Sequence, residues 1–298
     1  MKAYTESRNL YGTDTKNTAS ANLTYGDQMM NDFHRRLIAK ADWPFIHRLR
    51  TVNTTASTTF VALPYDVDQV ESVFVTVSGT RYNPIPAPSR AFWDQLHYTT
   101  QTSDTPEYWF VYNGQLGLWP RPATSSNVIS VNAKIKATDL NVADLTSSTI
   151  TTLANGSTSL TVSAGLTAQM PGFWIRPTFS TTANTGDGHW YELAGVTSAT
   201  IGTLSRAYGG NSIAVGTAAS TIAQMWLLPD AYQDIPEQYA AFRYWSKEKD
   251  SERAGIFKSL VVEGAGELFN TYSVNDVSMV LDDGESTMML NPNLTISL

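Results

Sequence analysis

Residues Asp234–Tyr272 have the sequence DIPEQYAAFRYWSKEKDSERAGIFKSLVVEGAGELFNTY, and no other run of the chain shows so strong a helical pattern. Asp234 is a favourable N-cap, Pro236 stands in the first turn, and Glu237 occupies the capping-box position three residues after Asp234. The polar residues 247–251 interrupt the pattern, so we predict two amphipathic helices or one long bent helix. Apolar side chains recur at steps of three and four and need a surface to pack on: Ile235, Tyr239, Phe242, Trp245, Ala254, Phe257, Val261, Ala265, Leu268 and Tyr272.

A second helix is predicted over residues 24–41, with Thr24 as its cap and Asp27 at the capping-box position. We expect it to end before Pro44, because the residue that precedes a proline disfavours helical geometry. Its apolar ridge is the natural packing partner of the C-terminal helices: Tyr25, Met29, Phe33, Leu37 and Ala41. The basic run His34, Arg35 and Arg36, followed by His47, Arg48 and Arg50, has two interpretations. It is either a solvated surface or an electrostatic contact with an acidic partner.

The middle of the chain has the pattern of β-structure. Residues 51–140 contain the clean strand Val70–Val77 and the hairpin signal Asn113-Gly114. Residues 141–228 contain short strand candidates separated by turn signals, which predicts an inserted barrel or sandwich-like module. We therefore predict an α+β fold, in which a small helical bundle from both ends of the chain accompanies an antiparallel β region. The expected domains are an extended arm (1–23), a body of helices and β-structure (24–140 and 229–272), the β module (141–228) and an extended tail (273–298).

The composition excludes several classes of protein. The chain of 298 residues contains no cysteine, which excludes disulfide frameworks and thiol chemistry. Its net charge of −7 argues against general nucleic-acid binding through phosphate neutralisation. The N-terminus has no apolar segment typical of a signal peptide, and no run of 18 apolar residues occurs, so we expect neither secretion nor a membrane span.

Residues with catalytic chemistry are sparse. The four histidines, at positions 34, 47, 97 and 189, have no metal-ligand spacing. The most site-like segment is residues 186–189, where Asp187 and His189 admit a hydrolase hypothesis, although Asp-Gly is ordinary turn chemistry. Trp174 and Trp190 in the Ser/Thr-rich module admit a carbohydrate-binding or receptor-binding tail module as the alternative function. We predict a protein that is not an enzyme and has no cofactor or metal.

The order of several short motifs gives a more specific indication. Over residues 24–140 and 226–272 the chain resembles the head-to-tail adaptor (connector) proteins of tailed bacteriophages, including the tail tubular proteins of short-tailed phages. Residues 141–228 have no counterpart in the plain form of that family. The motifs that establish the resemblance are Asp42-Trp43-Pro44-Phe45, Leu63-Pro64-Tyr65-Asp66, Val70-Glu71-Ser72-Val73, Thr105-Pro106-Glu107-Tyr108-Trp109, Leu118-Trp119-Pro120-Arg121-Pro122, Leu228-Pro229-Asp230 and Ile235-Pro236-Glu237-Gln238-Tyr239.

The resemblance implies a structural virion protein of the neck, assembled in the host cytoplasm. Such adaptors form a homo-oligomeric ring, commonly of twelve copies, below the portal protein and above a tail, nozzle or tail-tube protein. The ring extends the channel through which double-stranded DNA passes without specific binding, and an acidic chain that repels DNA suits this role. The residues expected at interfaces with other copies or partners are Arg35, Arg36, Tyr239, Phe242, Trp245, Phe257, Leu268, Tyr272, Met288, Leu290, Leu294 and Ile296.

Overall fold

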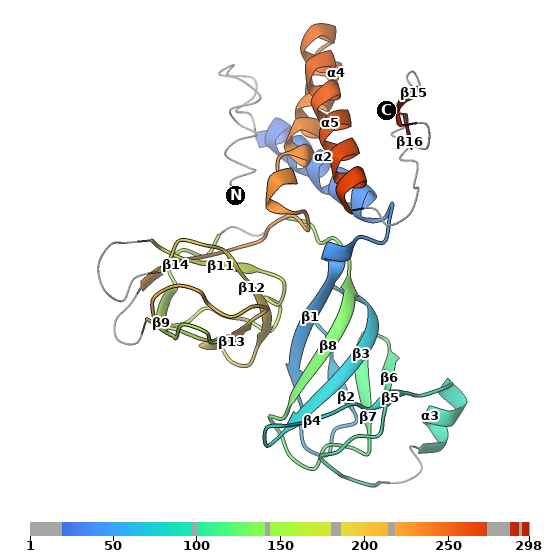
Figure 1. The fold of residues 1–298 in the computed structure, drawn as a ribbon, viewed down its shortest axis with the longest axis vertical. Coiled ribbons are helices and arrows are strands. Elements are labelled where there is room, and N and C mark those ends of the chain that lie inside the picture. The colour runs from blue at the N-terminus through green and yellow to red at the C-terminus, as the bar shows by residue number, and fades with distance from the viewer. Residues whose placement is uncertain are drawn as a thin grey trace. The chain divides into compact units, whose positions relative to one another are not determined.

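The computed structural model describes residues 20–96, 100–140, 144–179, 186–213, 218–272, 287–291 and 294–297 (Figure 1). Side chains are described only for those of these residues that lie between 26 and 272. The chain forms two compact units. The first, which we call the helical unit, comprises Met1–Ile46, Lys136–Asn141 and Met225–Leu298. The second, the β unit, comprises His47–Ile135 and Val142–Gln224. Each unit is described separately below.

The helical unit contains the helices that the sequence pattern predicts. α4 packs against both α2 and α5, and α4 and α5 are separate helices. The break between them includes Lys249, whose φ of 61° lies in the left-handed region and cannot continue a right-handed helix. The elements of this unit are α2 (Ser20–Ile38), η2 (Pro44–Ile46), η3 (Asp230–Tyr232), α4 (Ile235–Lys247), α5 (Ser251–Tyr272), β15 (Thr287–Asn291) and β16 (Leu294–Ser297).

The helix starts differ from the predicted ones. α2 begins at Ser20, so Thr24 lies inside the helix and does not cap it. Asp234 has helical backbone angles and makes no capping bond with its side chain; its Oδ2 instead accepts a hydrogen bond from Gln238 Nε2 at 2.6 Å. A capping box requires an extended N-cap backbone, and the preceding turn η3 leaves Asp234 in the right-handed region. The observed cap is Asp250, whose Oδ1 accepts the backbone N–H of Arg253 at 3.0 Å at the start of α5.

Aromatic side chains form the interior of the helical unit. Phe33 of α2 stacks on Tyr239 of α4, with ring centroids 4.4 Å apart. Trp43 is fully buried, lies 4.7 Å from Phe269 of α5, and donates its indole N–H to Leu37 O at 3.1 Å. The predicted ridge of the first helix therefore contributes Phe33 and Leu37 to this core. The Trp43 ring packs on Phe269 and its indole N–H has a hydrogen-bond acceptor. These two contacts hold the segment after α2 against α5.

Two four-stranded, mostly antiparallel sheets of the β unit pack on a common core. Within the described residues their strand orders are β1-β8-β3-β4 and β2-β7-β6-β5. They share a core that includes Val73, Leu116, Leu118, Ile129 and Val131. The elements are β1 (His47–Asn53), β2 (Phe60–Ala62), β3 (Val67–Val77), β4 (Thr80–Tyr82), β5 (Ile85–Pro86), α3 (Arg90–Leu96), β6 (Tyr108–Tyr112), β7 (Gln115–Trp119) and β8 (Val128–Ile135).

The predicted hairpin at Asn113-Gly114 is confirmed. Both residues have positive φ, 51° and 72°, as a type I′ turn requires, and Tyr112 pairs with Gln115 on either side of it. The turn fixes the register in which Trp109 faces Leu118 across β6 and β7. Local turn chemistry thus sets which side chains of this sheet reach the shared core.

Six strands between residues 149 and 223 form a closed barrel. The sequence predicts a barrel or a sandwich-like module here, and the barrel is confirmed. The strand order is β10-β13-β12-β11-β14-β9. Its interior is filled by alternating apolar residues such as Ile150, Leu160, Ile175 and Leu193. The strands are β9 (Thr149–Leu153), β10 (Ser159–Val162), β11 (Trp174–Pro177), β12 (Tyr191–Val196), β13 (Ile201–Leu204) and β14 (Ala218–Ala223). Closure of the barrel pairs its strands on both sides and so removes free strand edges.

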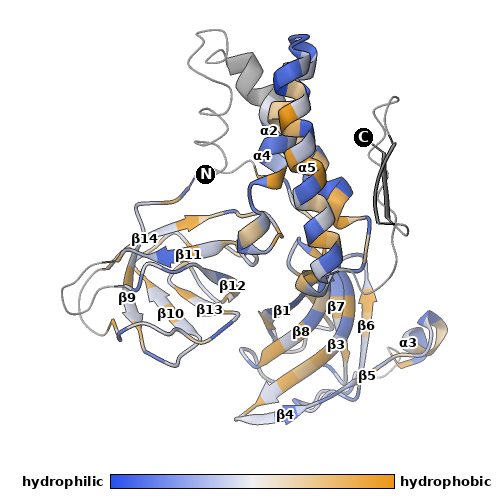
Figure 2. Ribbon diagram, turned by 45° about the horizontal axis from the view of Figure 1, so that its top comes forward, coloured by the Kyte–Doolittle hydropathy of each residue, from blue (hydrophilic) through white to orange (hydrophobic). Residues whose placement is uncertain are grey.

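Hydrophobic and hydrophilic residues alternate along many of the described helices and strands, as the hydropathy colouring shows (Figure 2). No described helix is both long enough and apolar enough to span a membrane. The predicted arm (1–23) lies outside the described residues except for 20–23, which open α2. Of the predicted tail, residues 273–286 lie outside the description, and β15 pairs with β16 in an antiparallel hairpin.

Candidate functional site

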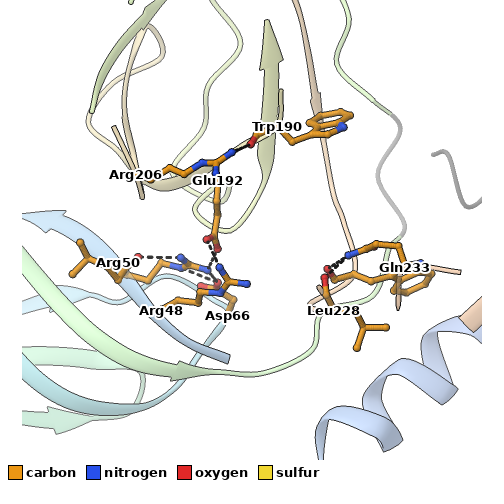
Figure 3. Close-up of polar contacts among 10 residues, drawn as sticks. Arg48, Arg50, Asp66, Trp190, Glu192, Arg206, Leu228 and Gln233 are labelled. Atoms are coloured by element: carbon orange, nitrogen blue, oxygen red, sulfur yellow. Dashed lines mark hydrogen bonds and ion pairs between the residues drawn. The ribbon is translucent and has the colours of Figure 1, made fainter. Parts of the chain in front are cut away.

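The β unit contains a buried ionic centre around Arg50 (Figure 3). Arg50 lies on β1 and its side chain is fully buried. Its Nε and Nη2 donate to Asp66 Oδ2 at 2.9 and 2.6 Å, and Nη2 also donates to Glu192 Oε1 at 2.8 Å. Asp66 lies in the turn before β3, and Glu192 lies on barrel strand β12. One guanidinium therefore joins the sheet to the barrel.

The charges of this centre balance. Arg48, which is partly exposed, places Nη1 3.3 Å from Glu192 Oε2, so two guanidiniums face two carboxylates. Burial lowers the pKa of Arg50, but Glu192 and Asp66 outweigh it and raise that pKa above its ordinary value. Arg50 is thus ionised inside the protein. A buried charge is tolerated when it is paired and hydrogen-bonded, and the loss of one partner leaves the other uncompensated.

Two glycines allow the barrel to approach β1 this closely. A Cβ on Gly195 of β12 would lie 2.0 Å from Thr51 Oγ1, and a Cβ on Gly172 would lie 2.7 Å from Asp66 Oδ2. Gly172 also has a φ of 89°, which side-chain-bearing residues rarely adopt. Backbone therefore packs directly on the sheet at these positions. The barrel is held on β1 by close packing in addition to the ion pairs.

The predicted basic run is less positive than its sequence indicates. His34 is buried, and its Nε2 accepts the backbone N–H of Leu227 at 3.0 Å. Burial, and then the charge of Arg35, lower the pKa of His34 to about 3, so the ring is neutral at ordinary pH. Arg35 forms ion pairs with Asp32 and with Asp139, the latter at 3.1 Å. Arg36 is exposed and forms no ion pair within the described part of the chain.

The second half of the basic run belongs to the β unit and is also paired. His47 Nδ1 lies 2.7 Å from Glu71 Oε1, and Arg48 and Arg50 face the carboxylates of the ionic centre. His47, Arg48 and Arg50 therefore fit neither interpretation of the basic run, since their side chains pair with carboxylates of the same unit. The reason is that the carboxylate partners stand at positions 66, 71 and 192, which sequence neighbourhood does not reveal.

The predicted interface residues of α4 and α5 occupy different environments. Leu268 and Phe242 are buried within the chain, and Tyr239 stacks on Phe33. Three others are half-buried: Trp245, Phe257 and Tyr272. The Arg253 guanidinium lies 4.4 Å above the Trp245 ring, and Tyr272 meets Phe45 edge-on at 5.5 Å. Met288 and Leu290 lie on β15, and Leu294 and Ile296 lie on β16. The side chains of these four residues are not among those that the structure describes.

The structure reveals an exposed apolar pair that the sequence-based list omits. Ile256 and Leu260 of α5 are 55% and 39% exposed. They lie one turn apart on the side of α5 opposite to buried Val261, Ala265 and Leu268. The signal was available as an i, i+4 step, but the stronger stripe on the buried side of the same helix obscured it.

The residues of the hydrolase hypothesis form a turn. Asp187 Oδ1 accepts the backbone N–H of His189 at 3.0 Å, and Oδ2 accepts the hydroxyl of Tyr191 at 2.5 Å. Within the described residues no hydrogen bond joins this carboxylate to the His189 ring. No group of three or more potential metal ligands occurs among the described residues.

Trp190, one of the two tryptophans of the carbohydrate-binding hypothesis, is partly covered. The Arg176 guanidinium lies 5.0 Å above the Trp190 ring, and Arg206 Nη2 donates to Trp190 O at 3.0 Å. One face of the ring is thus used by a cation within the barrel. A sugar that stacks on that face would have to displace Arg176.

Comparison with known proteins connects this architecture to a family. No curated protein matches the chain. The sequence profile of one family, described as SU10 adaptor protein, matches residues 5–280. The matched range includes residues 141–228, which form the barrel region. This chain belongs to the SU10 adaptor protein family and is a phage adaptor-type structural protein.

Proposed function

We propose that this protein is a head-to-tail adaptor of the virion neck, which forms a homo-oligomeric ring between the portal protein and the tail. The observation on which this proposal rests is the adaptor-family match over residues 5–280. The order of short motifs along residues 24–140 and 226–272 supports the same assignment. The ring has about twelve copies, as the resemblance to connector proteins implies; a contact between unlike surfaces of neighbouring copies closes into such a ring.

The net charge of the chain supports a structural role beside DNA. The chain has a net charge of −7, and a passing duplex is repelled by an acidic wall. The basic side chains of β1, Arg48 and Arg50, form ion pairs with carboxylates inside the β unit. This arrangement supports the proposed extension of the DNA channel without specific DNA binding.

The helical unit supplies candidate contacts for neighbouring copies and for partners. Its half-buried Trp245, Phe257 and Tyr272 and its exposed Arg36 remain accessible to another chain. The strands β15 and β16, with Met288, Leu290, Leu294 and Ile296, suit addition to the portal or to a tail protein through main-chain hydrogen bonds.

The proposal is tested by the oligomeric state. We expect purified protein, alone or with its portal ring, to form closed rings with a central channel in electron micrographs, at the mass measured by light scattering. Co-sedimentation with the portal checks the placement in the neck. A protein that stays monomeric both alone and with the portal would refute the ring.

A further inference from the structure

The outer side of α5 combines exposed apolar groups with acidic ones. Ile256 and Leu260 are exposed, as are Glu252, Glu263 and Glu267. Steps of four, four, three and four residues along 252, 256, 260, 263 and 267 place all five on one side of the helix. We call these five residues the α5 stripe. Figure 2 shows both orange and blue residues along α5.

The acidic groups of the α5 stripe are Glu252, Glu263 and Glu267. None of the three glutamates forms an ion pair within the described part of the chain. The nearby Arg253 lies 3.5 Å from Asp250 and covers the Trp245 ring. The stripe therefore presents a negative, partly apolar surface whose exposed side chains would be removed from water only by another surface.

The end of α2 presents the complementary charge. Arg36 stands in the last turn of α2, and Lys40 stands in the turn that follows, four residues later. Both are exposed and neither forms an ion pair in the part of the chain that the structure describes. Arg35, by contrast, already faces Asp32 and Asp139. Arg36 and Lys40, which we call the α2 pair, are thus cations available to a partner.

The two surfaces lie on different helices of the same unit. α4 packs against α2 and also against α5. Each copy of the chain thus carries both the basic α2 pair and the acidic α5 stripe, and the stripe contains Ile256 and Leu260. When the basic surface of one copy meets the acidic surface of the next, the contact is between unlike patches and repeats from copy to copy. Opposite charges steer such an encounter and penalise wrong pairings.

From this complementarity we propose that the α2 pair of one copy binds the α5 stripe of the next copy. The occupant of the exposed Ile256–Leu260 surface is therefore a second copy of this chain. The inference rests on the proposed ring, and it specifies which surfaces hold neighbouring copies together.

Charge reversal tests the pairing. We expect Arg36→Glu with Lys40→Glu, and separately Glu263→Lys with Glu267→Lys, each to raise the concentration at half-assembly by about tenfold or more, because like charges then face each other. An equimolar mixture of the two variants should assemble again, since copies that alternate place opposite charges at every contact. One chain with all four reversals should also assemble. Light scattering measures the mass, and circular dichroism checks that each variant is folded.

A matched control carries Asp68→Lys and Glu107→Lys, two exposed carboxylates of the β unit. It changes the net charge as much as the α5 reversal and should leave assembly unchanged. If wild-type protein forms rings and both reversals assemble like wild type, the pairing is overturned while the ring stands. If each reversal weakens assembly but neither the mixture nor the fourfold variant restores it, the pairing is likewise overturned. If wild-type protein forms no oligomer either alone or with the portal ring, both proposals fail.

Discussion

The helical unit and the β unit differ in the side chains that fill their interiors. The helical unit has an aromatic interior in which Trp43, Phe33 and Phe269 meet rings of neighbouring elements. The β unit combines a closed barrel with a neutral cluster of buried charges around Arg50. Aromatic packing depends on how well the side chains fill the interior. An ionic centre depends on the presence of every partner.

This difference indicates a division of roles. The ionic centre and the close approach at Gly195 hold the barrel on the sheet, so they favour one geometry of the β unit. The helical unit covers one side of α5 and leaves Ile256 and Leu260 exposed on the other. We infer that the β unit contributes rigidity and that the helical unit contributes surfaces for assembly.

The largest expected effect is in the aromatic interior. Leu268→Asp places an unpaired carboxylate where the side chain is fully buried, and we expect a loss of about 4 kcal/mol or more in the free energy of unfolding. Thermal melting followed by circular dichroism measures it. Asn270→Asp adds the same group at an exposed position of α5 and serves as the control. A Leu268→Asp variant that melts within about a degree of wild type would contradict the packing of α5.

The second-largest loss of stability is expected from a substitution in the ionic centre around Arg50. Glu192→Gln keeps the shape of the side chain but leaves Arg50 and Arg48 short of a negative charge, and we expect a loss of about 3 kcal/mol. Hydrogen exchange should show greater opening of β1 and β12 than of α5. Glu107→Gln, at an exposed position, is the matched control. Equal exchange in wild type and Glu192→Gln would show that the centre does not hold the barrel on the sheet.

Acid should weaken the helical unit through His34. Its pKa is about 3 in the folded chain against an ordinary 6.5, so the unfolded chain takes up the proton first. Stability from this group is complete above pH 6.5 and falls as the pH decreases toward 3, by at most about 1.4 kcal/mol per pH unit. In His34→Gln the amide oxygen can accept the Leu227 N–H without titrating. Urea unfolding at pH about 7 and about 5 should show a smaller acid loss in the variant than in wild type.

The smallest effect on stability is expected at the C-terminus. Removal of residues 274–298 deletes β15 and β16 but none of the buried residues of α5. We expect an unchanged melting temperature together with weaker co-sedimentation with the portal ring. Binding that equals that of the full chain would remove these strands from the proposed portal contact.

Local pattern predicted much of the fold. The steps of three and four in residues 234–272 identified α4 and α5, because a helix face is set by neighbours within two turns. Asn113-Gly114 identified a hairpin, since its turn depends on the backbone freedom of two residues. The caps at Asp234 and Thr24 were predicted wrongly, because what precedes a helix decides whether its first residue is extended.

The amino-acid sequence alone therefore determined the helices, the barrel-forming segment and the order of motifs that indicates a phage adaptor. Long-range folding decided which charges are paired and which are free. Arg50 and Glu192 are 142 residues apart and meet at 2.8 Å, whereas Arg36, in the same predicted basic run, has no partner in the described chain. Because an ion pair depends on distance in space and not on spacing along the chain, no local pattern separates these cases. The side of α5 that faces solvent was settled in the same way, by where α4 packs.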